Sequence, residues 1–81
     1  MTATHIQSLK KAKPFRPFRI FTTLGERFDV TNPHQIMVAG NTILIGVEID
    51  PKDQLPGGME YRGIEFIERT EALAQRTRRP R

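Results

Sequence analysis

Apolar and polar residues alternate with a period of two from Phe18 onward, which is the pattern of a half-buried β-strand. After a turn at Gly25 the alternation resumes over residues 27–30. Glycine can adopt the positive φ that a tight hairpin turn requires. The pattern therefore predicts a hairpin with an apolar inner face. The residues that share this face by parity are Phe18, Ile20, Phe28 and Val30.

A second hairpin is predicted in the middle of the chain, after the break at Asn32-Pro33-His34. Gln35 to Ala39 has the composition of a strand, and residues 42–49 form a β-branched segment. Gly40-Asn41 between them is typical of a hairpin turn.

The last third of the chain mixes strand and loop signals. Residues 50–58 contain two prolines and two glycines and predict a loop. Residues 59–67 predict a strand, with a bulge or a close approach at Gly63. For residues 68–75 the composition favours a short helix, although a strand ending near Leu73 also fits.

The chain begins with a helical signal. Thr4 and Gln7 have the spacing of a capping box, which predicts a short helix from about residue 4 to 12, ended by Pro14. The predicted fold class is thus α+β and mainly β. It consists of this helix, a bent antiparallel meander of four or five strands resembling a small open barrel, and a short C-terminal helix. Residues 1–75 are expected to form one domain, and residues 76–81 a disordered basic tail.

Composition narrows the class of protein further. The 81 residues include no cysteine, which excludes disulfides, thiolate metal sites and cysteine nucleophiles. No apolar stretch approaches the roughly 20 residues that span a bilayer, and residues 1–12 lack the apolar run of a signal peptide. We therefore expect a soluble, cytoplasmic protein that does not engage membranes. So short a chain has a small core, which favours self-association.

One segment carries a family resemblance. Residues 14–20 read Pro-Phe-Arg-Pro-Phe-Arg-Ile, and a Gly-containing turn, an aromatic-x-Val strand and Asn32-Pro33-His34 follow. This order resembles a group of short uncharacterised bacterial proteins with a Pro-Phe-x-Pro-Phe-x-Ile segment and a Gly-turn hairpin. The resemblance covers about the first half of the chain and implies a fold without implying an activity. Glu68 to Ala74 is more polar than the apolar last strand expected of that group.

No motif for catalysis or for a cofactor is present in the sequence. His5 and His34 are the only histidines, and neither has a second ligand at metal-site spacing. Glu48, Asp50 and Asp53 cluster around a loop but lack the spacing of a calcium loop. We therefore expect no catalytic residue, no bound metal and no cofactor.

Charge is distributed unevenly along the chain. The net charge is +4, but all nine acidic residues lie between residues 20 and 75. Both ends are basic and could contact phosphates, with Phe15, Phe18 or Tyr61 as a stacking surface. The candidate nucleic-acid-binding residues are Lys10, Lys11, Lys13, Arg16, Arg19, Arg78, Arg79 and Arg81.

Two functions follow from these observations. The first is a non-catalytic protein-binding or adaptor module, with an unidentified protein or a second copy of the chain as its partner. The alternative is a small nucleic-acid-associated protein that uses the basic residues at both ends. An acidic middle of the chain repels a polyanion, so the sequence favours the first function.

Overall fold

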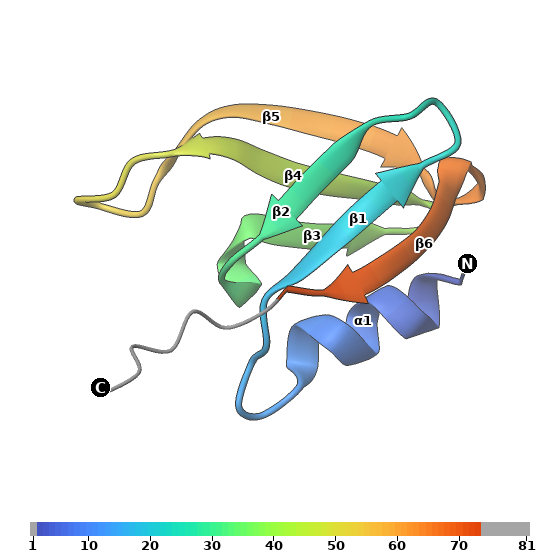
Figure 1. The fold of residues 1–81 in the computed structure, drawn as a ribbon, viewed down its shortest axis with the longest axis horizontal. Coiled ribbons are helices and arrows are strands. Elements are labelled where there is room, and N and C mark those ends of the chain that lie inside the picture. Colours follow the sequence, from blue (N-terminus) through green and yellow to red (C-terminus); the bar gives the residue numbers. More distant parts are fainter. Residues whose placement is uncertain (1, 74–81) are drawn as a thin grey trace, which may run out of the picture.

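The computed structural model describes residues 2–73, which form one helix and six strands (Figure 1). All strand pairs are antiparallel. Two three-stranded sheets result, with strand orders β2-β1-β6 (the first sheet) and β3-β4-β5 (the second sheet). The elements are α1 (Ala3–Lys11), β1 (Phe18–Thr22), β2 (Arg27–Val30), β3 (Ile36–Ala39), β4 (Thr42–Ile49), β5 (Pro56–Gly63) and β6 (Ile67–Ala72), with 3₁₀ turns η1 (Pro33–Gln35) and η2 (Ile64–Phe66).

The α+β, mainly β class is confirmed, but the predicted single meander of four or five strands is wrong. The last strand, β6, returns to β1 and pairs with it from Phe18↔Ala72 to Phe21↔Arg69. The described strands therefore form two small sheets, and they do not form a closed barrel. A period of two identifies a segment as a strand but does not say which other strand it pairs with. The pairing of β1 with β6 joins segments about 50 residues apart in the sequence, so the alternation could not predict it.

The first hairpin has the predicted register. Phe18 lies opposite Val30 and Ile20 opposite Phe28, so the four predicted residues share one face. In the turn, the Gly25 amide donates to the Thr22 carbonyl over 3.1 Å and the Thr22 amide donates to the Glu26 carbonyl over 3.0 Å. Gly25 has φ +85°, as the left-handed position of a three-residue hairpin loop requires.

The second hairpin is also confirmed, with one change at its start. The pair Ala39↔Thr42 encloses the two-residue turn, and Gly40 has φ +61°. Gln35 does not belong to β3, as the sequence had predicted, but ends η1. The side chain of Asn32 accepts a hydrogen bond from the His34 amide at 2.9 Å and starts this 3₁₀ turn. A short polar cap thus draws residue 35 out of the strand.

Three predictions for the last third of the chain need correction. The loop is shorter than residues 50–58, because β5 begins at Pro56, a first position on an edge strand where proline is tolerated. The predicted strand 59–67 is interrupted by η2. In the described part of residues 68–75 the favoured helix is wrong, and the alternative, a strand ending near Leu73, is confirmed: β6 ends at Ala72 and its backbone pairs with β1. The predicted tail, residues 76–81, lies outside the described residues.

The predicted N-terminal helix is present, but its N-cap lies two residues earlier than the capping box had predicted. Thr2, not Thr4, is the N-cap, and its hydroxyl oxygen accepts a hydrogen bond from the His5 amide at 3.1 Å. The helix docks onto the sheets through Ile6, its one buried residue. In Figure 1 it lies below β3 and β6.

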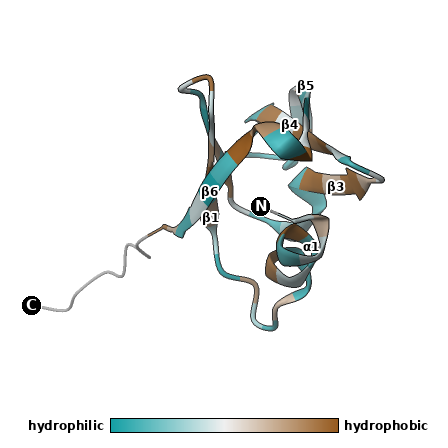
Figure 2. Ribbon diagram, turned by 90° about the vertical axis from the view of Figure 1, so that its right-hand side faces the viewer, coloured by the Kyte–Doolittle hydropathy of each residue, from teal (hydrophilic) through white to brown (hydrophobic). Residues whose placement is uncertain are grey.

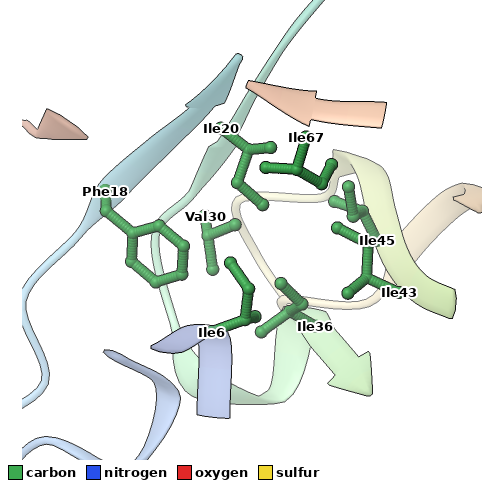
Figure 3. Packing of buried hydrophobic residues seen from close by; sticks show 8 residues of the cluster. All are labelled: Ile6, Phe18, Ile20, Val30, Ile36, Ile43, Ile45 and Ile67. Atoms are coloured by element: carbon green, nitrogen blue, oxygen red, sulfur yellow. The ribbon is translucent and has the colours of Figure 1, made fainter. Parts of the chain in front are cut away.

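The core lies between the two sheets and the helix (Figure 3). Every strand except β5 contributes at least one buried apolar residue to this core. Most of them are isoleucine, whose branched side chain packs well on a pleated sheet. The core residues are Ile6, Phe18, Ile20, Val30, Ile36, Ile43, Ile45 and Ile67.

Gln35 links the two sheets through a buried side-chain amide. Its Nε2 donates to the carbonyl of Asp29 in β2 at 2.6 Å and to the carbonyl of Gly46 in β4 at 2.8 Å. Its Oε1 accepts from the amide of Thr31 at 2.8 Å and from the Thr31 hydroxyl at 3.1 Å. By register, residue 35 would be the next partner of Gly46 after the pair Ile36↔Ile45, so the side chain replaces a missing backbone pair.

A second polar link joins the sheets at the other end of β2. The Arg62 guanidinium of β5 donates to both carboxylate oxygens of Glu26, at 2.8 and 2.6 Å, and to Glu60 at 3.1 Å. The guanidinium carbon lies 5.3 Å from the ring centroid of Phe28. Hydrogen bonding to Arg62 lowers the pKa of Glu26.

Candidate interaction surface

Two of the candidate nucleic-acid-binding residues, Lys10 and Arg19, form hydrogen bonds within the fold. Lys10 donates from Nζ to the carbonyl of Ile36 at 2.7 Å, at the open edge of β3. Arg19 forms a bidentate salt bridge with Asp29, in which Nε donates to Oδ1 at 2.6 Å and Nη2 to Oδ2 at 3.2 Å. The hydrogen bond to Asp29 raises the pKa of Arg19. Both cations therefore have structural partners that a phosphate would have to displace.

The remaining basic residues do not form one surface with the predicted aromatic residues. Lys11, Lys13 and Arg16 are exposed near the end of α1 and in the segment that follows. Phe18 is only 2% exposed and belongs to the core, so it offers no stacking face. Tyr61 lies on β5, in the second sheet. Arg78, Arg79 and Arg81 lie outside the described residues.

Phe15, which precedes Arg16 in the chain, is half-buried and packs on the core. Its ring centroid lies 6.0 Å from that of Phe18. Phe15 thus fastens the connection between α1 and β1 to the core.

Three of the polar residues singled out in the sequence, His5, Asp50 and Asp53, have local structural contacts. His5 Nε2 lies 3.4 Å from the Thr70 hydroxyl and links α1 to β6. Asp50 accepts from the amide of Lys52 at 2.7 Å and Asp53 from that of Leu55 at 2.9 Å, which shapes the loop between β4 and β5. In residues 2–73 no three His, Cys, Asp or Glu side chains converge where they could hold a metal ion.

Within the described part of the chain, α1 is the only α-helix, and it is neither long nor apolar enough to cross a membrane.

An open depression of about 460 Å³ separates β2 from the end of β4. Arg19 and Asp29, which line it, are already paired with each other. Across residues 2–73 no buried side-chain nitrogen or oxygen lacks a hydrogen-bond partner, so none points into this depression unsatisfied. The other charged residues that line it, Arg27 and Glu48, are exposed to solvent, so the depression lacks the buried polar groups that orient a small ligand in a pocket.

A different feature distinguishes the second sheet: its outer face, which points away from the core, is apolar. Across the three strands Met37 lies opposite Leu44, and Leu44 lies opposite Tyr61. Met59, which precedes Tyr61 by two residues and so lies on the same face of β5, is opposite Gly46. Met37, Met59 and Tyr61 are 58%, 53% and 69% exposed, and Leu44 is half-buried. We call these four residues the outer face; Figure 2 shows apolar colouring along β3 and β4.

Strand geometry explains why the outer face is exposed. The alternate residues Ile36, Ile43 and Ile45 point into the core. Successive residues of a strand point to opposite sides of a sheet, so Met37 and Leu44 must point outward. Directly opposed side chains on antiparallel strands lie close enough to contact one another. The outer face is therefore one patch and not four isolated apolar residues.

The second sheet also has a free edge. β5 is the last strand in the order β3-β4-β5, and it is eight residues long. Among the described strands, only its neighbour β4 pairs with it. An edge strand of this length offers the backbone donors and acceptors on its open side to another strand.

The sequence analysis did not identify the outer face, although a signal was present. Residues 36–39 and 42–47 are apolar at nearly every position and do not alternate. Such runs are typical of strands with apolar residues on both faces. Tyr61 had been predicted only as a stacking surface for nucleic acid.

Comparison of the chain with protein-family models, with curated proteins and with solved structures found no match.

Proposed function

We propose that this protein is a non-catalytic protein-binding module and that the outer face of the second sheet is its contact surface. The observation that carries the proposal is the row Met37–Leu44–Tyr61, which places apolar side chains from three strands next to one another. Contiguous apolar patches on small domains commonly mark contact surfaces.

The chemistry of the outer face supports a protein partner. Tyrosine is enriched among the residues that dominate binding energy, and methionine adapts its shape to an apolar partner. Burial of apolar area contributes about 25 cal/mol for each Å² removed from water. Both charged residues of β5, Glu60 and Arg62, lie on the opposite side of the sheet, where they bond each other. An apolar protein surface therefore fits the outer face better than a polyanion does.

The nucleic-acid alternative has less support from the described residues. Of the eight basic residues that it requires, Lys10 and Arg19 have partners within the fold. Phe18, which was predicted as a stacking residue, is buried in the core and unavailable. The outer face carries none of the eight.

Affinity capture from the native cell, with nuclease treatment and mass spectrometry, tests the proposal. We compare the unaltered protein with the double variant Met37→Ser, Tyr61→Ser. Leu24→Ser is the matched control, because Leu24 is 69% exposed but lies alone in the β1–β2 turn. We expect a nuclease-resistant partner that the double variant loses and the control retains.

Two results would contradict the proposed function. One is a captured partner that the double variant retains as well as the control does. The other is capture that nuclease treatment abolishes, which would favour the nucleic-acid alternative.

A further inference from the structure

The free edge of β5 presents a defined set of backbone groups. The amide of Ile64 donates to the carbonyl of Asn41 at 2.6 Å, which fixes the phase of the β4–β5 ladder. Hydrogen-bonded pairs alternate along an antiparallel ladder, so residues 60 and 62 bond β4, while Met59, Tyr61 and Gly63 direct their backbone groups outward. Consistently, the Tyr61 carbonyl accepts a hydrogen bond from the Arg62 side chain at 2.7 Å.

We propose that β5 pairs antiparallel with β5 of a second copy of the chain, about a two-fold axis at Tyr61. The inference rests on the proposed function, since it names a partner for the same sheet. Pairing would join two second sheets into one six-stranded sheet and place two outer faces side by side. The length of the edge and the charges along it carry the inference.

Charge selects this register. With Tyr61 opposite Tyr61 of the second copy, Glu60 lies opposite Arg62, and by symmetry Arg62 lies opposite Glu60. A shift of the axis to Glu60 would oppose two carboxylates, and a shift to Arg62 would oppose two guanidiniums. Opposite charges on facing strands stabilise a pair of strands, and like charges destabilise it.

Residue size agrees with the same register. The Met59 side chain would face Gly63, which has no side chain to obstruct it. The start of η2, at Ile64, would arrive opposite Gly58. Bulky residues therefore meet glycines at both ends of the paired segment, and the two tyrosines meet at its centre. Edge-to-face aromatic contact between them would add to the pairing.

The outward groups of Met59, Tyr61 and Gly63 would supply about six backbone hydrogen bonds between the copies. The Tyr61 carbonyl can accept from the second copy while keeping its bond to Arg62, because a carbonyl oxygen has two lone pairs. The contact area of a strand this short is smaller than the about 800 Å² per partner of a standard interface. We therefore expect a weak dimer that forms as the protein concentration rises.

Sedimentation equilibrium up to about 1 mM protein measures the dimer, since a millimolar dissociation constant marks the weak limit of specific association. Glu60→Arg would place like charges opposite each other twice and should raise the dissociation constant about tenfold or more. Glu68→Arg makes the same change of charge on β6, where Glu68 is exposed, and should leave the constant unchanged. Circular dichroism confirms that both variants are folded. Equal effects of the two substitutions, or a monomer throughout, would overturn the inference.

Disulfide cross-linking tests the register, because the natural chain has no cysteine. In the proposed pair the Cα atoms at position 61 lie about 5.5 Å apart, within disulfide range. Positions 59 and 59 are separated by four residues along the strands, about 13 Å, which is too far. Under mild oxidation Tyr61→Cys should therefore cross-link to itself and Met59→Cys should not. Equal cross-linking of the two variants, or none by Tyr61→Cys, would overturn the inference.

The two proposals can fail separately. Met37 lies on β3, two strands away from the β5 edge. If Met37→Ser abolishes partner capture while Tyr61→Cys fails to cross-link, the proposed function stands and the β5 dimer is refuted. If cross-linking succeeds while no captured protein depends on the outer face, the dimer stands and the proposed function is refuted.

Discussion

Replacing Gln35 with leucine would test the link between the two sheets. Leucine has a similar size, so the cavity created is small, but it cannot bond the carbonyls of Asp29 and Gly46 or the amide of Thr31. The bond to Gly46 lies in a buried setting, where an unpaired carbonyl costs about 1–3 kcal/mol. The groups of Asp29 and Thr31 are partly accessible, and water can replace part of what they lose.

From these contributions we expect Gln35→Leu to lower the free energy of unfolding by about 3 kcal/mol. A domain of this length has a total stability of roughly 4–12 kcal/mol, so the loss is a large fraction of it. The midpoint of thermal unfolding should fall by roughly 12–24 °C. Circular dichroism melting and urea denaturation measure both quantities.

Gln7→Leu is a suitable control, because Gln7 is only partly buried on α1 and leucine is a good helix former. Gln35→Asn provides a second comparison, since the shorter amide retains its polarity but cannot span β2 and β4 at once. It should lose a similar amount of stability. A change of less than about 3 °C in Gln35→Leu would show that the amide does not hold the sheets together.

Three other substitutions have defined outcomes. Glu26→Gln should lower the melting temperature at neutral pH, because hydrogen bonding to Arg62 lowers the pKa of Glu26 below its ordinary 4.5. A lowered carboxylate pKa stabilises the fold above pH 4.5 and this stabilisation is lost as the carboxylate is protonated, so the difference from the natural protein should shrink in melts at increasingly acidic pH. Gly25→Ala should cost about 1–2 kcal/mol in urea denaturation, since φ +85° strains any residue with a Cβ and no neighbouring atom obstructs the new methyl group; an unchanged stability would contradict the turn assignment. Ile6→Ala should cost about 2–5 kcal/mol and increase hydrogen exchange throughout α1, because Ile6 is fully buried and anchors the helix; protection equal to that of the natural protein would show that other contacts hold α1.

Local pattern determined the strands and turns of the first two hairpins. The parity of Phe18, Ile20, Phe28 and Val30 fixed their shared face before any contact was known, because a strand has a strict period of two. Gly25 and Gly40 marked turns since each supplies a positive φ. These features depend on neighbours in the chain, and the sequence contains them.

Other assignments depended on partners far away in the sequence. The composition of residues 68–75 favoured a helix over a strand, yet β6 (Ile67–Ala72) is a strand because β1 offers a free edge with which to pair. The role of Gln35 arises only when Asp29 and Gly46 come within reach of one amide. No local rule distinguishes this glutamine from an exposed one.

The same distinction between local pattern and distant partners applies to the candidate interaction surface. The sequence alone determined that Met37, Leu44 and Tyr61 are apolar residues on strands, and that the chain has no motif for catalysis. Only the tertiary structure decided that these three side chains form one row, because the row depends on the registers of β3, β4 and β5 together. It also decided that Lys10 and Arg19 are bonded within the fold, since their partners are contributed by other strands. A strand's own pattern sets which side chains share a face, whereas the contacts across that face require the pairing of separate strands.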